Sequence, residues 1–169
     1  KAFQRELAEA ILSLPPHLEA VVFDVGANDG RWSAALLHGL HASFMNLPSN
    51  FKLVLVEPLP FYSTNLEQLA RTHAPHIIYH RAAAWTHNAG SLTMHSARPS
   101  QLWTRGETSS LLSEYAIAHG ATRQNKVGTI SLAELIDNYT RPIHPERSNG
   151  PGLVAMKLDV EGSEYSLLP

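Results

Sequence analysis

VVFDVGANDG, residues 21–30, is the stretch of this 169-residue chain on which the fold depends. Its first half, Val21–Val25, is a short run of mostly β-branched apolar residues, which is typical of a strand buried on both faces of a parallel sheet. Gly26 ends this run and Gly30 follows four positions later, so the chain can turn sharply from a strand into a helix. The stretch therefore predicts the first strand, turn and helix of an α/β domain.

Strand and helix patterns alternate along the rest of the chain. Apolar residues recur every three or four positions from Phe3 to Leu14, which predicts a helix that Pro15 ends. Ser131, with Glu134 three positions later, predicts the capped start of another helix. The remaining patterns predict helices beginning near residues 29, 61 and 163, and strands at 53–57, 77–84, 91–95, 127–130 and 153–158. We expect the strand at 91–95 to be antiparallel and the strand at 127–130 to lie at a sheet edge.

This alternation predicts a single α/β domain over residues 1–169. Residues 1–16 form an N-terminal cap helix in this interpretation, and residues 21–168 form the core. Strands that alternate with helices favour a mostly parallel sheet with helices on both faces. The polar segment at 99–125 is the expected substrate loop.

Composition excludes several classes of protein. Lys and Arg number 13 and Asp and Glu number 15, a formal net charge of -2, so we expect no nucleic-acid partner. The absence of cysteine excludes disulfide scaffolds, thiolate metal sites and cysteine nucleophiles. No apolar run approaches the roughly 20 residues of a membrane-spanning helix. We interpret most of the ten histidines as surface residues and predict no metal site.

The glycine turn is the first candidate for ligand binding. In a parallel sheet, ligands bind beyond the carboxyl ends of the strands. Gly26 and Gly30 enclose three residues, which differs from the G-x-G-x-x-G spacing of dinucleotide sites. Asp24 and Asp29 disfavour a diphosphate and suit a ligand with an ammonium group and a positively charged centre, such as S-adenosylmethionine. The alternative is that the glycine turn serves only for packing.

Two further groups of acidic residues fall at predicted strand ends. Glu57 ends the second strand, where a carboxylate can accept hydrogen bonds from ribose hydroxyls of either NAD or S-adenosylmethionine. The alternative, when Glu57 is taken alone, is a solvated carboxylate at a strand end. Asp159 and Glu161 follow the strand at 153–158, and either is a candidate general base. Both also suit a purely structural role at a helix N-terminus. Two carboxylates fall short of a full coordination shell for a divalent cation.

Taken in order, the motifs resemble those of one family. They are Val22-Phe-Asp24-Val-Gly26-Ala-Asn28-Asp-Gly30, Val56-Glu57-Pro58, Ala83-Ala84-Trp85-Thr followed by Gly90-Ser-Leu92, Ser109-Ser110-Leu111, and Lys157-Leu-Asp159-Val-Glu161-Gly162-Ser-Glu164. Together they resemble the FkbM-type S-adenosylmethionine-dependent methyltransferases over roughly residues 21–168. The resemblance implies a class I methyltransferase fold, which is Rossmann-like, and an enzyme that methylates a hydroxyl of a sugar or small natural product.

The resemblance also implies roles for nine residues. It implies Asp24, Gly26, Asn28 and Gly30 around the methionine part of the cofactor S-adenosylmethionine, Glu57 on the ribose, Ala84 and Trp85 near the adenine, and Asp159 and Glu161 as the catalytic residues of the reaction cleft. We choose Asp159 as the first candidate for the base and Glu161 as the second. The acceptor is expected to be a small-molecule or glycan hydroxyl.

The end of the chain departs from the family pattern. Such a fold continues with further strands after the helix that begins near Ser163, so we expect a chain truncated after the fourth core strand. Two other functions stay open. One is a non-catalytic binding module derived from a methyltransferase. The other is an NAD-dependent oxidoreductase, which the missing G-x-G-x-x-G spacing disfavours. The sequence indicates neither oligomeric state nor compartment.

Overall fold

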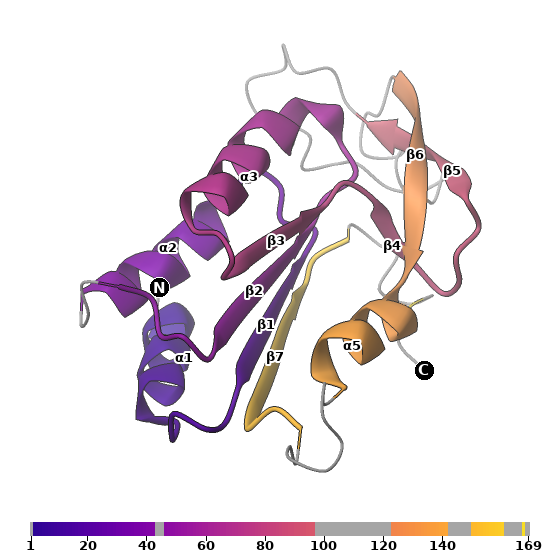
Figure 1. Ribbon diagram of the computed structural model, residues 1–169. Coiled ribbons are helices and arrows are strands. Elements are labelled where there is room, and N and C mark those ends of the chain that lie inside the picture. The colour runs from indigo at the N-terminus through magenta and orange to yellow at the C-terminus, as the bar shows by residue number, and fades with distance from the viewer. Residues whose placement is uncertain (1, 43–45, 97–122, 142–149, 161–166, 168–169) are drawn as a thin grey trace.

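The structure is a computed structural model that describes residues 2–42, 46–96, 123–141, 150–160 and 167 (Figure 1). The helices are α1 (Ala2–Ser13), α2 (Arg31–His41), α3 (Pro60–Thr72) and α5 (Leu132–Thr140). The strands are β1 (Ala20–Val25), β2 (Phe51–Val56), β3 (Ile77–His80), β4 (Ala83–Trp85), β5 (Ser91–Ser96), β6 (Arg123–Ser131) and β7 (Leu153–Leu158).

The main sheet has four strands in the order β3-β2-β1-β7, and each neighbouring pair is parallel. All six residues of β1 are buried, as the run of apolar residues predicted. In register, Asp24 of β1 lies between Leu55 of β2 and Lys157 of β7. The predicted parallel sheet is therefore confirmed.

Helices cover both faces of this sheet, as predicted. Figure 1 shows α1, α2 and α3 on one side of the strands and α5 on the other. Alternate residues of β1 point to opposite faces. Val22 packs in the apolar cluster that includes α1, α2 and α3, whereas Val21 and Phe23 pack in a second cluster with Leu135 of α5.

The cap of α5 and the buried face of α1 confirm local sequence signals, and one residue of α1 departs from them. The Ser131 side chain accepts a hydrogen bond from the Glu134 N–H at 3.3 Å, which caps α5 as predicted. Within α1, Leu7 and Ile11 are buried. Phe3 is 55% exposed although it shares their periodicity; it lies in the first turn of α1, with its ring tilted against that of Trp32 at a centroid distance of 6.4 Å.

A second sheet of three strands, in the order β4-β6-β5, corrects two predictions. The single strand predicted at 77–84 is wrong: the Ala82 N–H bonds back to the His80 carbonyl at 3.0 Å, which turns the chain out of β3 before β4 begins. The edge position predicted for 127–130 is also wrong. β6 is longer than expected and pairs on both sides, parallel to β4 and antiparallel to β5, as 91–95 was expected to pair.

The path of the chain through the main sheet places the site. The chain runs from β1 to β2 to β3 in one direction and then returns to add β7 on the other side of β1. This reversal of strand order is a topological switch point, and ligands of open parallel sheets bind at the carboxyl ends of the strands there. We therefore expect a ligand to bind at the segments that follow β1, β2 and β7. Most of the predicted substrate loop at 99–125, namely residues 99–122, lies outside the described residues, and 123–125 belong to β6.

Candidate active site

The carboxyl ends of β1, β2 and β7 are joined by backbone hydrogen bonds into one rim, which can be followed in Figure 1. The Gly26 N–H donates to the Val56 carbonyl at 2.9 Å, which joins the turn after β1 to the end of β2. The Asp159 N–H donates to the Val25 carbonyl at 3.0 Å, which joins the end of β7 to β1. The structure thus brings together the three segments that the sequence singled out.

The glycine turn has the left-handed geometry that its composition suggests. Gly26, Asn28 and Gly30 have φ angles of 76°, 53° and 81°. At Gly26 a close approach adds to this requirement, because a Cβ atom built there would lie 1.8 Å from the Asp159 carbonyl oxygen. Only glycine fits between β1 and the end of β7 at this point.

Most amides of this turn are already bonded within the protein. The Gly26 and Ala27 N–H groups donate to the Val56 carbonyl, and the Gly30 N–H donates to the Ala27 carbonyl at 2.9 Å. The Asn28 N–H donates to Oε2 of Glu57 at 3.0 Å. A dinucleotide site needs free amides at this position to hold a diphosphate, so the turn is poorly suited to one.

Glu57 lies directly after β2 and is 5% exposed. Its Oε2 accepts the Asn28 N–H, and its Oε1 accepts the Leu59 N–H at 2.9 Å. Burial raises the pKa of Glu57 to about 7, although these two backbone hydrogen bonds act to lower it. Because each carboxylate oxygen has two lone pairs, the carboxylate keeps acceptor capacity for a ligand.

Asp24 has a protein partner where the sequence suggested a ligand ammonium group. It is fully buried in β1, and its Oδ2 accepts a hydrogen bond from the Ser33 hydroxyl at 2.6 Å. Its Oδ1 accepts one from Nζ of Lys157 at 3.1 Å. Burial raises the pKa of Asp24, and the charge of Lys157 opposes that shift. Direct contact between Asp24 and a ligand ammonium group therefore does not fit this geometry.

Lys157 is the residue of the rim that the sequence analysis missed. Its Nζ donates to the Gly26 carbonyl at 2.8 Å as well as to Asp24, and it lies 3.5 Å from Oδ2 of Asp159. The signal was a lysine inside the apolar strand 153–158. A charged residue in such a strand needs a partner, and a buried Asp24 on the neighbouring strand is the natural one.

Of the remaining acidic candidates, Asp159 and Asp29 belong to the described residues and Glu161 does not. The Asp159 side chain is 60% exposed at the end of β7, so it can reach a bound molecule. Glu161 lies outside the described residues. Asp29 pairs with the Arg31 side chain at 2.8 Å instead of remaining available to a ligand ammonium group.

Ala84 and Trp85 lie in β4, which pairs with β6 of the second sheet. Ala84 is buried in the same apolar cluster as Val56, the last residue of β2, whereas Trp85 is partly exposed. Of the two residues expected near the adenine, Ala84 thus shares a cluster with the end of β2, where Glu57 follows.

His80 is more than the surface residue that we inferred. Its Nε2 lies 2.8 Å from the hydroxyl of Tyr139 on α5, and both side chains are partly buried. Burial lowers the pKa of His80 and raises that of Tyr139, so both groups are favoured in their neutral forms. The pair ties the end of β3 to α5.

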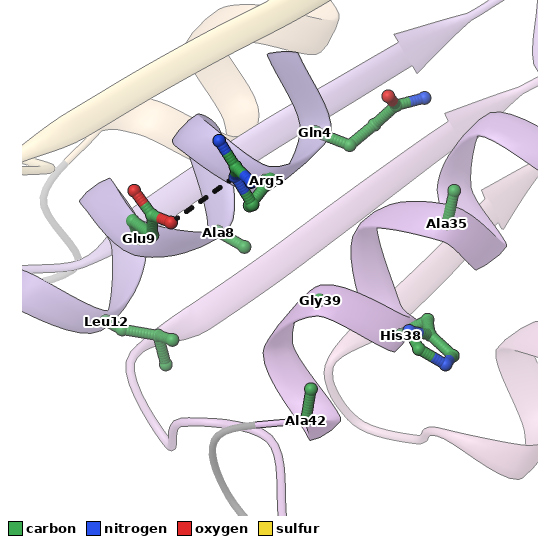
Figure 2. A pocket seen from close by; sticks show the side chains of 9 residues that line it. All are labelled: Gln4, Arg5, Ala8, Glu9, Leu12, Ala35, His38, Gly39 and Ala42. Carbon is green, nitrogen blue, oxygen red and sulfur yellow. Dashed lines mark ion pairs between the residues drawn. The ribbon is translucent and has the colours of Figure 1, made fainter. Parts of the chain in front are cut away.

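A surface groove also lies between α1 and α2, away from the rim (Figure 2). Its lining side chains include Ala8, Leu12 and Ala35, together with the Arg5–Glu9 ion pair. Both charged side chains of that pair are largely exposed, which is ordinary for a helix surface. None of the rim residues lines this groove.

Across the described residues, no helix is long and apolar enough to cross a membrane. Within the same residues, no cluster of three or more His, Asp or Glu side chains could hold a metal ion.

Comparisons with known proteins bear on the same residues. A family model described as the Methyltransferase FkbM domain matches residues 24–169, a range that includes the whole rim. A solved structure described as a candidate S-adenosylmethionine dependent methyltransferase from Listeria monocytogenes is 12% identical, over 81% of this chain and 82% of that one, with a TM-score of 0.29. At that TM-score the similarity carries no argument. A search of curated proteins gave no match.

Proposed function

Because the chain belongs to the FkbM methyltransferase domain family, we propose that it transfers the methyl group of S-adenosylmethionine to a hydroxyl of a sugar or small natural product. The observation that carries the choice of donor is the contact between Glu57 and Asn28. It joins a buried carboxylate at the end of β2 to the glycine turn after β1, at 3.0 Å. A carboxylate in this position suits the two hydroxyls of a ribose, and the adjoining turn suits the rest of the ligand.

The charges of the rim support a cationic nucleoside over a dinucleotide. Asp24, Glu57 and Asp159 are balanced by Lys157 alone among the contacts described above. A diphosphate would lie near the Glu57 and Asp159 carboxylates and against a turn whose amides are largely bonded. S-adenosylmethionine carries a positively charged sulfur and no phosphate, so its chemistry fits the residues present. This disfavours the NAD-dependent alternative.

In this proposal each residue has a defined task. Glu57 accepts the ribose hydroxyls, and Ala84 with the partly exposed Trp85 lies near the adenine. Gly26, Asn28 and Gly30 shape the turn beside the methionine part, and Asp24 supports that turn from beneath through Lys157.

The reaction is a displacement at carbon, for which positioning of the acceptor oxygen is the main requirement. The bound donor supplies a methyl group on a positively charged sulfur. Asp159 is the first candidate to take the hydroxyl proton, because its side chain is exposed at the rim. A general base of this kind contributes about 10²- to 10⁴-fold to the rate. Glu161 is the second candidate.

Calorimetric titration tests the choice of donor. We expect the protein to bind S-adenosylmethionine and S-adenosylhomocysteine, and to bind NAD far more weakly or not at all. Glu57→Ala removes two charge-assisted hydrogen bonds to the ribose, and should weaken binding of S-adenosylhomocysteine by about 100-fold. Glu6→Ala removes an exposed carboxylate on α1 and is the matched control. Binding of NAD alone, or of none of the three, would contradict the proposal.

A second experiment tests the acceptor. The protein is incubated with methyl-labelled donor and, separately, with sugars, small alcohols, a peptide mixture and RNA. We expect label on a sugar or small-molecule hydroxyl. Label on RNA or peptide would overturn the proposed acceptor, and donor binding without transfer to any of them would favour the non-catalytic binding module.

A further inference from the structure

Lys157 makes contacts on both sides of the switch point. Its ammonium group has three N–H bonds and three neighbouring acceptors. These are the Gly26 carbonyl at 2.8 Å, Oδ1 of Asp24 at 3.1 Å and Oδ2 of Asp159 at 3.5 Å. The first two distances are those of charge-assisted hydrogen bonds, and the third is that of an ion pair.

The position of this ammonium group is closely determined. Asp24 is fully buried and pairs with neighbouring strands on both sides of β1, so it offers Lys157 a fixed partner. The backbone of Lys157 is equally fixed, because it pairs in register with Asp24 in the sheet. The side chain is 21% exposed, so most of it is held within the protein.

The contact with the Gly26 carbonyl exceeds what a buried ion pair needs. Gly26 and Ala27 share one peptide group, whose oxygen accepts from Lys157 and whose N–H donates to the Val56 carbonyl at 3.1 Å. This peptide is thus held on both sides. The next N–H along the chain, that of Asn28, donates to Glu57. Lys157 is therefore one peptide group away from the contact that we assign to the ribose site.

We propose that Lys157 is a positioning residue for methyl transfer: it fixes the glycine turn that receives the donor and holds the Asp159 carboxylate beside that turn. This inference rests on the proposed function. It predicts that the position of the ammonium group, and not merely its charge, determines how well the donor binds.

The first test compares two variants that differ only at residue 157. Asp24→Asn removes the buried charge, and the double variant Asp24→Asn with Lys157→Met removes the ammonium group as well. Both avoid an unpaired buried carboxylate. We expect S-adenosylhomocysteine to bind the double variant at least about tenfold more weakly than the single variant, because the Gly26 carbonyl has lost its charged donor. Equal affinities would overturn the inference.

A second variant keeps the charge and so protects the fold. Lys157→Arg retains a cation beside Asp24, but its planar guanidinium cannot place a donor where the ammonium lies. We expect a melting temperature close to that of the original protein and an affinity for S-adenosylhomocysteine several-fold weaker. Unchanged affinity would show that charge alone suffices and would overturn the inference.

Ser33→Ala is the matched control, because Ser33 also bonds Asp24 but has no contact with Gly26 or Asp159 among its bonds described above. It should leave the affinity for S-adenosylhomocysteine within about twofold. If Ser33→Ala weakened binding as much as Lys157→Arg, support of Asp24 would explain both effects and the inference would fail. If the unaltered protein bound neither adenosyl compound, both the inference and the proposed function would be overturned. If it bound them and substitutions at residue 157 left the affinity unchanged, the inference alone would be overturned.

Discussion

The two sides of the rim each bury a carboxylate, but they treat its charge differently. Between β1 and β7, Asp24 meets a cation, Lys157, and a hydroxyl, Ser33. Between β1 and β2, Glu57 accepts from the backbone N–H groups of Asn28 and Leu59. The first carboxylate is neutralised within the protein. Among the described residues the second has no charged partner in contact; burial raises its pKa to about 7, and it is suited to receive a ligand.

The largest expected effect concerns the β1–β7 side of the rim. It distinguishes the role of the exposed carboxylate, Asp159, from that of the buried one, Asp24. Asp159→Asn should lower kcat by about 10²- to 10⁴-fold with the acceptor that the labelling experiment identifies. The affinity for S-adenosylhomocysteine should change little, because Asp159 is not assigned to donor binding. Steady-state kinetics and calorimetry on the same sample measure both. An unchanged kcat would remove Asp159 from the catalytic role.

The next effect comes from removing the ion pair between Lys157 and Asp24. Lys157→Met leaves the Asp24 carboxylate buried beside an apolar side chain, and we expect the free energy of unfolding near pH 8 to fall by about 3 kcal/mol. This is the lower end for a buried pair, because part of the Lys157 side chain is exposed. Urea denaturation measures it.

Lys52→Met is the control for that measurement. Lys52 pairs with Glu19 at 3.3 Å, and both side chains are partly exposed. Its loss should be below about 1 kcal/mol. If the two substitutions cost the same, the buried pair has no special role in stability.

The third effect concerns the close packing between β1 and β7. Gly26→Ala would place a Cβ atom 1.8 Å from the Asp159 carbonyl oxygen, at a φ of 76°. Gly90→Ala is a close control, since Gly90 has a φ of 75° and nothing within 4 Å of the added atom. Gly90→Ala should cost about 1 kcal/mol and Gly26→Ala at least about 2 kcal/mol more. Similar losses in urea denaturation would show that the end of β7 moves aside freely.

The smallest effect concerns Glu57, on the β1–β2 side of the rim, and is a dependence of ligand affinity on pH. Burial raises the pKa of Glu57 from 4.5 to about 7, and only the ionised carboxylate accepts from both ribose hydroxyls. Affinity for S-adenosylhomocysteine should therefore fall as pH falls through 7, by about tenfold between pH 8 and pH 6. Glu57→Ala should abolish this dependence. A flat profile in the unaltered protein would show that Glu57 is not the ribose acceptor.

The same group acts on stability with the opposite sign. Its folded pKa lies above the unfolded value, so the contribution of Glu57 to the free energy of unfolding is fully present below pH 4.5. That contribution is lost as pH rises through about 7. A bound ligand and a stable fold thus favour different protonation states of one carboxyl group.

Sequence patterns predicted the strands of the main sheet best where apolar residues follow one another. β1 and β2 are almost entirely buried, which explains their apolar runs. β7 is apolar apart from Lys157 but only partly buried, with Val154 47% exposed. All three strands were predicted to within a few residues. The break between β3 and β4 was missed because it depends on a single backbone bond from Ala82 to His80. The central place of β6 was missed because it arises from pairing with β5, which no local pattern encodes.

The candidate site divides in the same way. The glycine turn, Glu57 and Asp159 carry local signals, namely glycine spacing and acidic residues after apolar runs. The contact between Lys157 and Asp24 has no such local signal, because it spans 133 positions. A buried acid on one strand and a lysine inside another are each visible in the sequence, but only the strand order makes them neighbours.

The position of β1 between β2 and β7 also has a consequence for the order of folding. β1 can pair with β2 early, because the two are separated by a short helical segment, whereas pairing with β7 must wait for a chain segment more than a hundred residues away. Contacts of such separation close slowly, since the intervening chain must first lose its entropy. The contact between Lys157 and the Gly26 carbonyl therefore forms late in folding. Until it forms, Asp24 has no counter-ion from β7. A nascent chain reaches its ligand-binding geometry only when its most distant core strand has docked.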